Sequence, residues 1–429
     1  MKKRILAVIL CVTMLFGVIG CNGETEPQKQ SQDIGSDLGK DGENVWGSVA
    51  DQNRKAEEIL TDYEKEHPLS GFGFRFFKQM IKNEGTKENV LVSPLSVILA
   101  LYMTANGADG KTKDQMLEVL GENLNDYLKA YQVRLPQGDG YKMHIANSIW
   151  FRDTASLTVK DAFLNTNKTY FGAGVYKAPF NETTCKEINE WVKEHTDGMI
   201  SNILDEIPAD AMLYLINALC FDAEWENIYK ESSVVEGQTF TKEDGTKQKM
   251  TLMYSEESTY LEDKWATGFV KYYKDRKYAF VALLPKKGVT VSEYVEYLDE
   301  ENFHKLMSKT KITSVNAALP KFETAYDLLL NDVLMQMGMT DAFSGAADFT
   351  KMATCTDGNL YISRVLHKTF ITVDEKGTKA GASTVVEMTK ESAVMQSYTV
   401  RLDRPFVYML IDCETNQPFF VGTMMDVEN

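Results

Sequence analysis

The clearest pattern of hydrophobic and polar positions lies near the end of the chain, in residues 373–398. From Thr378 to Met388, every second residue is small or apolar, and all charges fall on the alternate positions. This alternation is typical of a strand with one face on a core. The same stretch is rich in Gly, Ala, Ser and Thr and lacks aromatic residues between 373 and 397, which is typical of an exposed loop.

Both interpretations hold if the segment is a loop in one state of the protein and a strand in another. No proline interrupts residues 378–398, so nothing there blocks ladder hydrogen bonds. As a strand, residues 378–388 would span roughly 36 Å. Lys390 is the first charge on the inward parity and would end the strand. The alternative is an ordinary hairpin strand in a weakly registered region.

The rest of the chain changes pattern along its length. Apolar residues at helical spacing predict helices within residues 72–81, 97–105, 112–120, 189–204 and 326–337, with Ser93 or Ser96 as a cap for the second. Strand-like runs follow, among them residues 144–151 and 214–221. Helices dominate the first third and strands the remainder. This order predicts an α+β fold with a large, mostly antiparallel sheet.

The first residues read MKKRILAVILCVTMLFGVIGC. A basic start and an apolar run over 5–19, too short for a comfortable membrane span, predict a secretion signal. Its end resembles the bacterial lipoprotein processing box. By that resemblance residues 1–20 are a lipoprotein signal peptide, Cys21 is lipid-modified, and the protein is extracytoplasmic and lipid-anchored to the bacterial cell membrane or envelope surface. A plain signal peptide cut nearby is the alternative.

Composition divides the remainder into two parts. Residues 22–48 carry little apolar content and many Gly, Gln, Asp and Glu residues, which is typical of a flexible tether. Residues 50–66 are charged with helical spacing. We therefore expect a tether and short helix over 21–66, followed by one domain over 67–429.

The formal net charge of -16 makes nucleic acid an unsuitable partner and argues against heparin-like cofactors. Signatures of catalysis are absent from the sequence: no GxSxG, HExxH or GxxxxGK[ST] motif occurs. The five histidines lie far apart, and Cys185, Cys220, Cys355 and Cys413 form no short-spaced pair. We therefore expect no metal and no cofactor, with the limit that scattered residues can converge in space.

Several long motifs, in order, closely resemble the serpins over about residues 70–427. They are NVLVSPLSVILALYMTANGADGKTKDQM (89–116), INALCFDAEW (216–225), LPKFE (319–323), MGMTDAFSGAADFT (337–350) and SYTVRLDRPFVYMLI (397–411). The resemblance implies a serpin fold with three β-sheets, eight or nine helices and an exposed reactive-centre loop. In the family, that loop corresponds to the alternating stretch described first.

The resemblance also assigns site residues by position. The sequence VDEKGTKAGAS (373–383) is similar to the hinge of inhibitory members, implying hinge residues Glu375, Gly377, Thr378, Ala380, Gly381, Ala382 and Ser383. The cluster called the shutter, beneath the main sheet, corresponds to Ser93, Ser96, Asn217 and His367, and the breach, where insertion begins, to Trp225. Two departures are Lys379, where an acidic residue is usual, and Ala223, where glycine is usual.

The function implied is suicide-substrate inhibition of an extracellular serine protease, or of a cysteine protease. The target would attack the loop and form a covalent acyl complex, and the cut loop would enter the main sheet of the monomeric inhibitor, which is not itself an enzyme. Counting forward from Glu375 places the attacked bond at Glu391-Ser392; counting back from Pro405 places it nearer Val394, and Lys390 would suit a trypsin-like enzyme. Alternatives are a non-inhibitory serpin acting as a binding module, and a surface hydrolase or solute-binding lipoprotein.

Overall fold

The computed structural model describes residues 30–34, 46–63, 68–85, 88–135, 141–378 and 397–427. Helices dominate its first third, as the sequence pattern predicted. Ten α-helices lie in the described ranges: α1 Val49–Asp62, α2 Pro68–Glu84, α3 Pro94–Ala105, α4 Gly110–Leu120, α5 Asn125–Arg134, α6 Asp161–Phe171, α7 Glu182–His195, α8 Val291–Tyr297, α9 Glu300–Ser308 and α10 Asn331–Met337.

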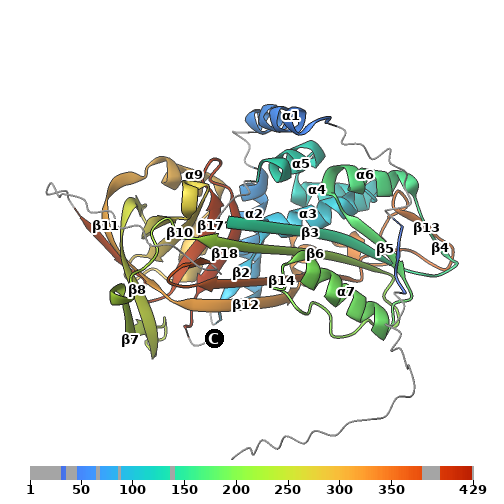
Figure 1. The fold of residues 1–429 in the computed structure, drawn as a ribbon. Coiled ribbons are helices and arrows are strands. Elements are labelled where there is room, and N and C mark those ends of the chain that lie inside the picture. Colours follow the sequence, from blue (N-terminus) through green and yellow to red (C-terminus); the bar gives the residue numbers. More distant parts are fainter. Residues whose placement is uncertain are drawn as a thin grey trace, which may run out of the picture.

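A seven-stranded sheet runs through the middle of the molecule (Figure 1). Its strands, from one edge to the other, are β1 (Gln32–Asp33), β5 (Gly174–Ala178), β3 (Tyr141–Arg152), β6 (Leu213–Glu224), β15 (Gly377–Thr378), β14 (Arg364–Val373) and β12 (Phe322–Leu329). The long strands β3 and β6 pair antiparallel from Tyr141↔Ala223 to Phe151↔Leu213. Strand β6 also pairs directly with β14, in parallel.

A nine-stranded sheet fills the left side of Figure 1. Its strands, in order, are β16 (Tyr398–Arg401), β11 (Lys311–Pro320), β8 (Lys247–Glu262), β9 (Ala266–Tyr272), β10 (Tyr278–Pro285), β17 (Phe406–Asp412), β18 (Pro418–Met424) and β2 (Val90–Val92), with β7 (Val234–Thr241) on β8. The pair β4 (Leu157–Val159) and β13 (Ala353–Cys355) makes a third sheet. The expected α+β fold with three sheets is confirmed.

Helix α3 lies against the seven-stranded sheet and is buried along its entire length. The sequence sets its start, because Ser93 accepts a hydrogen bond from the Ser96 amide and Pro94 occupies the first turn. Of the two candidate caps, Ser93 is therefore the one used. A helix that is apolar on nearly every face can be stable in this position because it is covered on every side.

Two helix predictions needed correction. The region predicted as a helix over 326–337 begins as strand β12, and α10 starts only at Asn331. The helix predicted over 189–204 is α7, and it begins earlier and ends earlier. Asn181 caps its start by accepting the Thr184 amide, and Asp197 and Gly198, both with positive φ, follow its end. Backbone capping decides these limits, whereas apolar spacing alone does not.

The segment expected to be a flexible tether contains an ordered part. Gln32 and Asp33 form β1, which pairs antiparallel with β5 at the edge of the seven-stranded sheet. Further along, α1 packs on α5, and its Ser48 and Asp51 form a capping box. In the described residues, no helix is both long and apolar enough to cross a membrane.

Candidate functional site

The first residues of the alternating stretch are already part of the seven-stranded sheet. Strand β15 lies between β6 and β14, with Gly377 opposite Glu224, and Thr378 opposite both Ala223 and Val373. Thr378 is 1% exposed and hydrogen-bonds through its hydroxyl to the Tyr273 hydroxyl. Its side chain therefore points inward, on the parity that the sequence pattern predicted.

Trp225 holds the backbone just before this entry point. Its ring N–H donates to the Asp374 carbonyl at 2.9 Å, and its amide donates to the Lys376 carbonyl at 2.8 Å. Its ring stacks on Tyr273 with centroids 4.3 Å apart. Trp225 is thus in direct contact with the residues that lead into β15.

Gly377 is needed because the two backbones approach closely. A Cβ atom at this position would lie 2.0 Å from the Ala223 carbonyl oxygen, well inside any allowed contact. Just before Gly377, the Asp374 carboxylate accepts hydrogen bonds from the backbone amides of Lys376 and Gly377, and these bonds fix a tight turn. This turn aims the chain between β6 and β14.

Glu375 lies on the outer side of the same turn. Lys321 donates to both of its carboxylate oxygens, each at 2.9 Å. Partial burial alone would raise the pKa of Glu375, but the hydrogen bonds and charge of Lys321, with a backbone hydrogen bond and the charge of Lys376, together lower that pKa. The Glu375 carbonyl accepts the Tyr229 amide at 2.8 Å, so the hinge is attached to its surroundings on both sides.

A buried ion pair, which sequence reasoning missed, lies beside Trp225. The Lys271 ammonium is 2.8 Å from the Glu257 carboxylate, and their side chains are 1% and 8% exposed. Burial alone would lower the pKa of Lys271, but Tyr229 and Glu257 raise it. Lys271 also lies over the rings of Trp225 and Tyr229, at 5.2 and 4.2 Å. The only sequence signal was a charge inside the apolar run FVKYY.

The four shutter residues come together beneath β6 and β14. The Ser93 amide donates to His367 Nε2 at 3.0 Å, and the Ser93 hydroxyl donates to the Phe419 carbonyl at 2.8 Å. The Ser96 hydroxyl donates to Asn217 Oδ1. A fifth member that sequence reasoning missed is Asn147 on β3, whose side-chain carbonyl accepts from Asn217. The cluster therefore links α3, β3, β6 and β14.

His367 is neutral at ordinary pH. It is 2% exposed, and burial lowers the pKa of its imidazole to about 4. Its Nε2 must be unprotonated to accept the Ser93 amide. In the sheet, His367 lies directly opposite Asn217. The shutter network is thus continuous with the ladder that joins β6 to β14.

That ladder is short. The direct pairing of β6 and β14 runs from Arg364↔Tyr214 to Lys368↔Ala218, which is five register pairs. At its far end, β15 separates the two strands at Ala223 and Glu224. A strand could thus enter between β6 and β14 by extending β15 and parting these five pairs.

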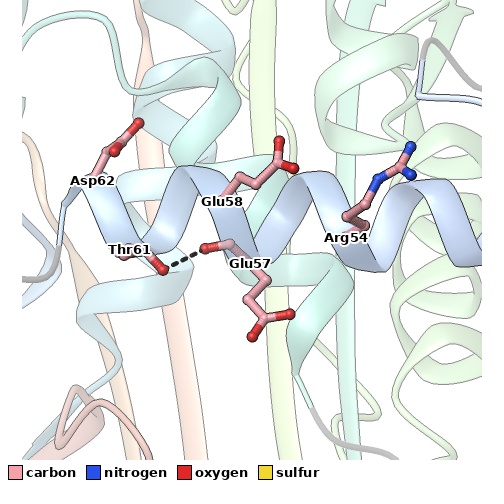
Figure 2. Close-up of a pocket in the computed structure, with 5 residues that line it drawn as sticks. All are labelled: Arg54, Glu57, Glu58, Thr61 and Asp62. Carbon is pink, nitrogen blue, oxygen red and sulfur yellow. Dashed lines mark hydrogen bonds between the residues drawn. The ribbon is translucent and has the colours of Figure 1, made fainter.

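Some predicted site residues cannot be placed. Ala380, Gly381, Ala382 and Ser383 of the hinge, the bond Glu391-Ser392, and the lipidation residue Cys21 lie outside the described residues. Elsewhere, a shallow depression lies on the outer face of α1 (Figure 2), lined by Arg54, Glu57, Glu58, Thr61 and Asp62. Its charged side chains do not converge on one point, and we assign it no chemistry.

Strand β15 lies between β6 and β14, and these two strands pair directly with each other farther along. This arrangement is that of a protein whose main sheet can gain a strand. The chain belongs to the serpin family. A family model described as Serpin (serine protease inhibitor) matches residues 67–427. Nine of the ten described helices lie in that range, in agreement with the eight or nine expected. Serpins are in general protease inhibitors rather than enzymes.

Similar proteins come from distant organisms. An uncharacterized serpin-like protein of Thermococcus kodakarensis is 28% identical, with 98% of each chain covered. The serine proteinase inhibitor A3K of Cavia porcellus is 27% identical, covering 89% of this chain and 95% of its own. The likeness therefore extends over nearly the full length of both relatives.

Among solved structures, the thermophilic serpin tengpin in its native state is 46% identical, with a TM-score of 0.80 over 84% of this chain and 93% of its own. Tengpin in its latent state is 45% identical, with a TM-score of 0.75 over 85% of this chain and 98% of its own. Human thyroxine-binding globulin, complexed with thyroxine, is 24% identical with a TM-score of 0.75, covering 85% of this chain and 99% of its own. That last likeness concerns the fold alone.

Proposed function

We propose that this protein is a suicide-substrate inhibitor of an extracellular serine or cysteine protease, and that it works by inserting its cleaved loop between β6 and β14. The attacking enzyme supplies the nucleophile and becomes bound as an acyl-enzyme. Insertion then carries the attached enzyme along the sheet before hydrolysis is complete. Loop insertion in serpins is a general example of a switch that works by releasing stored strain.

The observation that carries this proposal is the register of β15. Since Thr378 pairs antiparallel with Ala223, each later loop residue would pair one position earlier on β6, and Met388 would reach Leu213. The even-numbered loop residues would lie opposite the odd-numbered residues of β6, such as Leu215, Leu219 and Phe221, which face the main core. The small, uncharged loop parity would therefore be the buried one.

The charged parity also fits this register. Lys379 would lie opposite Asp222 on β6. On the other side, Thr378 opposite Val373 would bring Glu387 opposite Arg364 on β14. Opposite charges directly across two strands are favourable. Lys379 and Glu387, the two charges between residues 379 and 388, would thus each lie opposite a complementary charge. A loop that never becomes a strand would not require this match.

The test is incubation with a panel of proteases followed by denaturing gels and melting curves. We expect a covalent complex that survives boiling, and a cleaved inhibitor that melts well above the intact one. Clean cleavage with no complex would favour the non-inhibitory alternative. A cleaved form that melts no higher than the intact form would refute insertion.

Two further points belong to the proposal. The attacked bond is Glu391-Ser392, and the mass of the released C-terminal peptide distinguishes it from cleavage near Val394 or after Lys390. The protein is a monomer held at the outer side of a bacterial membrane by lipid on Cys21, which the resemblance of residues 18–21 to the lipoprotein processing box supports. Labelling with a radioactive fatty acid, lost in Cys21→Ser, tests the anchor.

A further inference from the structure

Residues 30–34 are attached to the body by backbone hydrogen bonds. Gln32 lies opposite Lys177, and Asp33 lies opposite Tyr176 on β5. The Ile34 amide donates to the Val175 carbonyl at 2.9 Å, and the Ile34 side chain packs against the core. We call residues 30–34 the docked segment. It adds a strand to the edge of the sheet (Figure 1).

Helix α7 supplies a specific receptor for the start of this segment. The Glu187 carboxylate accepts the amides of Gln30 and Ser31 at 2.6 and 3.0 Å, one on each oxygen. Asn181 donates to the Gln30 side-chain carbonyl at 3.0 Å. Glu187 is only 7% exposed and lies among the buried residues of α7. A carboxylate so placed requires hydrogen-bond donors, and the docked segment provides two.

The sheet register shows at which end of the molecule the docked segment lies. Gln32 on β1, Lys177 on β5, Phe151 on β3 and Leu213 on β6 occupy one row across the sheet. The hinge enters at the opposite end, at Ala223. The ten residue steps between Leu213 and Ala223 correspond to roughly 33 Å.

The docked segment is close in sequence to the lipidation residue. Nine residue steps separate Cys21 from Gln30, and a fully extended chain of that length reaches roughly 30 Å at most. We propose that the docked segment sets the orientation of the anchored protein on a lipid surface. The Leu213 end of the seven-stranded sheet faces the lipid, and the hinge end, at Ala223 and Thr378, faces away. This inference rests on the proposed lipid anchor.

The orientation has a consequence for inhibition. In the register of β15, insertion carries Met388 to the row of Leu213, which is the row of the docked segment. The inserted strand and β1 would then be four strand spacings apart, or about 19 Å. A protease attached to the cut loop is thus brought to the lipid-facing end of its inhibitor when it is trapped.

The experiment measures energy transfer from two probe sites to acceptor lipids in vesicles. A fluorescent amino acid replaces Asp210, which is exposed and near Leu213, or Lys277, which is exposed and near the hinge end. The chain from residue 21 carries either its natural lipid or a histidine tag bound to nickel-chelating lipids. We expect severalfold stronger transfer at position 210 than at 277 with either attachment. Equal transfer at both positions in the tagged chain would overturn the proposal.

Variants test whether the docked segment is responsible. Glu187→Ala removes the carboxylate that receives the docked segment. Ile34→Pro removes the amide that donates to Val175; it lies outside the serpin domain and changes none of that domain's side chains. Each should abolish the difference between positions 210 and 277. The matched control is Glu190→Ala, on the exposed side of α7, which should retain it. A difference that persists in Ile34→Pro would overturn the proposal.

The outcomes separate this inference from the proposed function. If the natural chain does not float with vesicles but the tagged chain is oriented, the lipid anchor is wrong and the role of the docked segment is supported. If the chain is oriented but forms no covalent complex with any protease, inhibition is wrong and the orientation is again supported.

Discussion

The two large sheets of this molecule are held together in different ways. In the nine-stranded sheet, β10, β17 and β18 are buried at every position and pair along their lengths. Aromatic rings also join these strands to each other, as in the stack of Phe280 on β10 and Tyr408 on β17, with centroids 5.5 Å apart. In the seven-stranded sheet, β6 and β14 meet over five pairs, beneath which lie the polar side chains of Ser93, Ser96, Asn217 and His367.

The difference shows that the pairing of β10, β17 and β18 is permanent, whereas the pairing of β6 with β14 can be exchanged for pairing with an inserted strand. We call the latter the exchangeable ladder. Apolar burial is lost as soon as packed side chains separate, so parting β10, β17 and β18 would expose side chains that are buried at every position. A backbone hydrogen bond contributes only about 1 kcal/mol net to stability, and exchanging its partner for an equivalent one changes the free energy little. The backbone groups of β6 and β14 would find such partners on an inserted strand. We therefore expect variants in the two sheets to fail in different ways.

The largest effect is expected for Thr378→Arg. Thr378 is 1% exposed, and an arginine there would bury a cation without a designed partner, at a cost of several kcal/mol. Because Thr378 already lies in the sheet of the intact protein, arginine would force β15 out from between β6 and β14. The cut loop could then not follow it into the sheet, and the protein would become a plain substrate. Denaturing gels should show cleavage with no covalent complex. Lys379→Arg, on the outward parity, is the control and should form the complex normally.

Phe280→Ala should damage the permanent sheet instead. Phe280 is 0% exposed, and truncating such a residue typically costs about 3–5 kcal/mol. Because this sheet is the same before and after insertion, the intact and cleaved forms should both melt at lower temperature, by similar amounts. Ile312→Ala, at a 74% exposed position of the same sheet, should leave both unchanged. A drop confined to the intact form would contradict the comparison.

The sequence predicted part of the seven-stranded sheet and of the candidate site, but not the contacts between distant strands. The alternation after Thr378 gave the inward parity of the hinge, and Ser93-Pro94 gave the start of α3. Asn147 was missed because it lies 70 residues from its partner Asn217, and only the β3–β6 register brings the two together. Spacing along a chain reports local structure, whereas register is decided between strands.

The docked segment was missed for a different reason. Its composition is polar, and it is held mainly through backbone amides, by β5 and by Glu187. Backbone hydrogen bonding leaves no mark on the pattern of side chains, so residues 30–34 read as part of a flexible tether. The buried charge of Lys271 was likewise not interpretable until Glu257 was found 2.8 Å from it.

The next largest effect is expected from acid, which should weaken the pairing of β6 with β14. Burial lowers the pKa of His367 from 6.5 to about 4, whereas an open sheet that admits water would restore the ordinary value. Above pH 6.5 both states are neutral at this residue. Between about 6.5 and 4 only the open state gains the proton, so the closed sheet loses stability as pH falls, on the order of 3 kcal/mol in total. Below about 4 both states are protonated and the change ends.

The measurement is the rate of spontaneous conversion to a loop-inserted or polymeric form between pH 7 and pH 4.5, which should rise steadily as pH falls. His367→Gln, which cannot be protonated in this range, should remove most of that dependence. His367→Ala should convert at a different rate from the unmodified protein at pH 7, because the Ser93 amide loses its acceptor. An identical pH profile in His367→Gln would assign the effect to other groups.

The smallest effect concerns the charges that meet only after insertion. In the register of β15, Glu387 would lie opposite Arg364, and such a cross-strand pair is worth roughly 0.2–1 kcal/mol. Glu387→Arg should place like charges together and lower the melting temperature of the cleaved protein while leaving the intact protein unchanged. Arg364→Glu alone should act in the same direction, and the double exchange should restore most of the loss. Because only an inserted strand brings these positions together, additive losses in the double variant would mean that the loop enters the sheet in another register, or not at all.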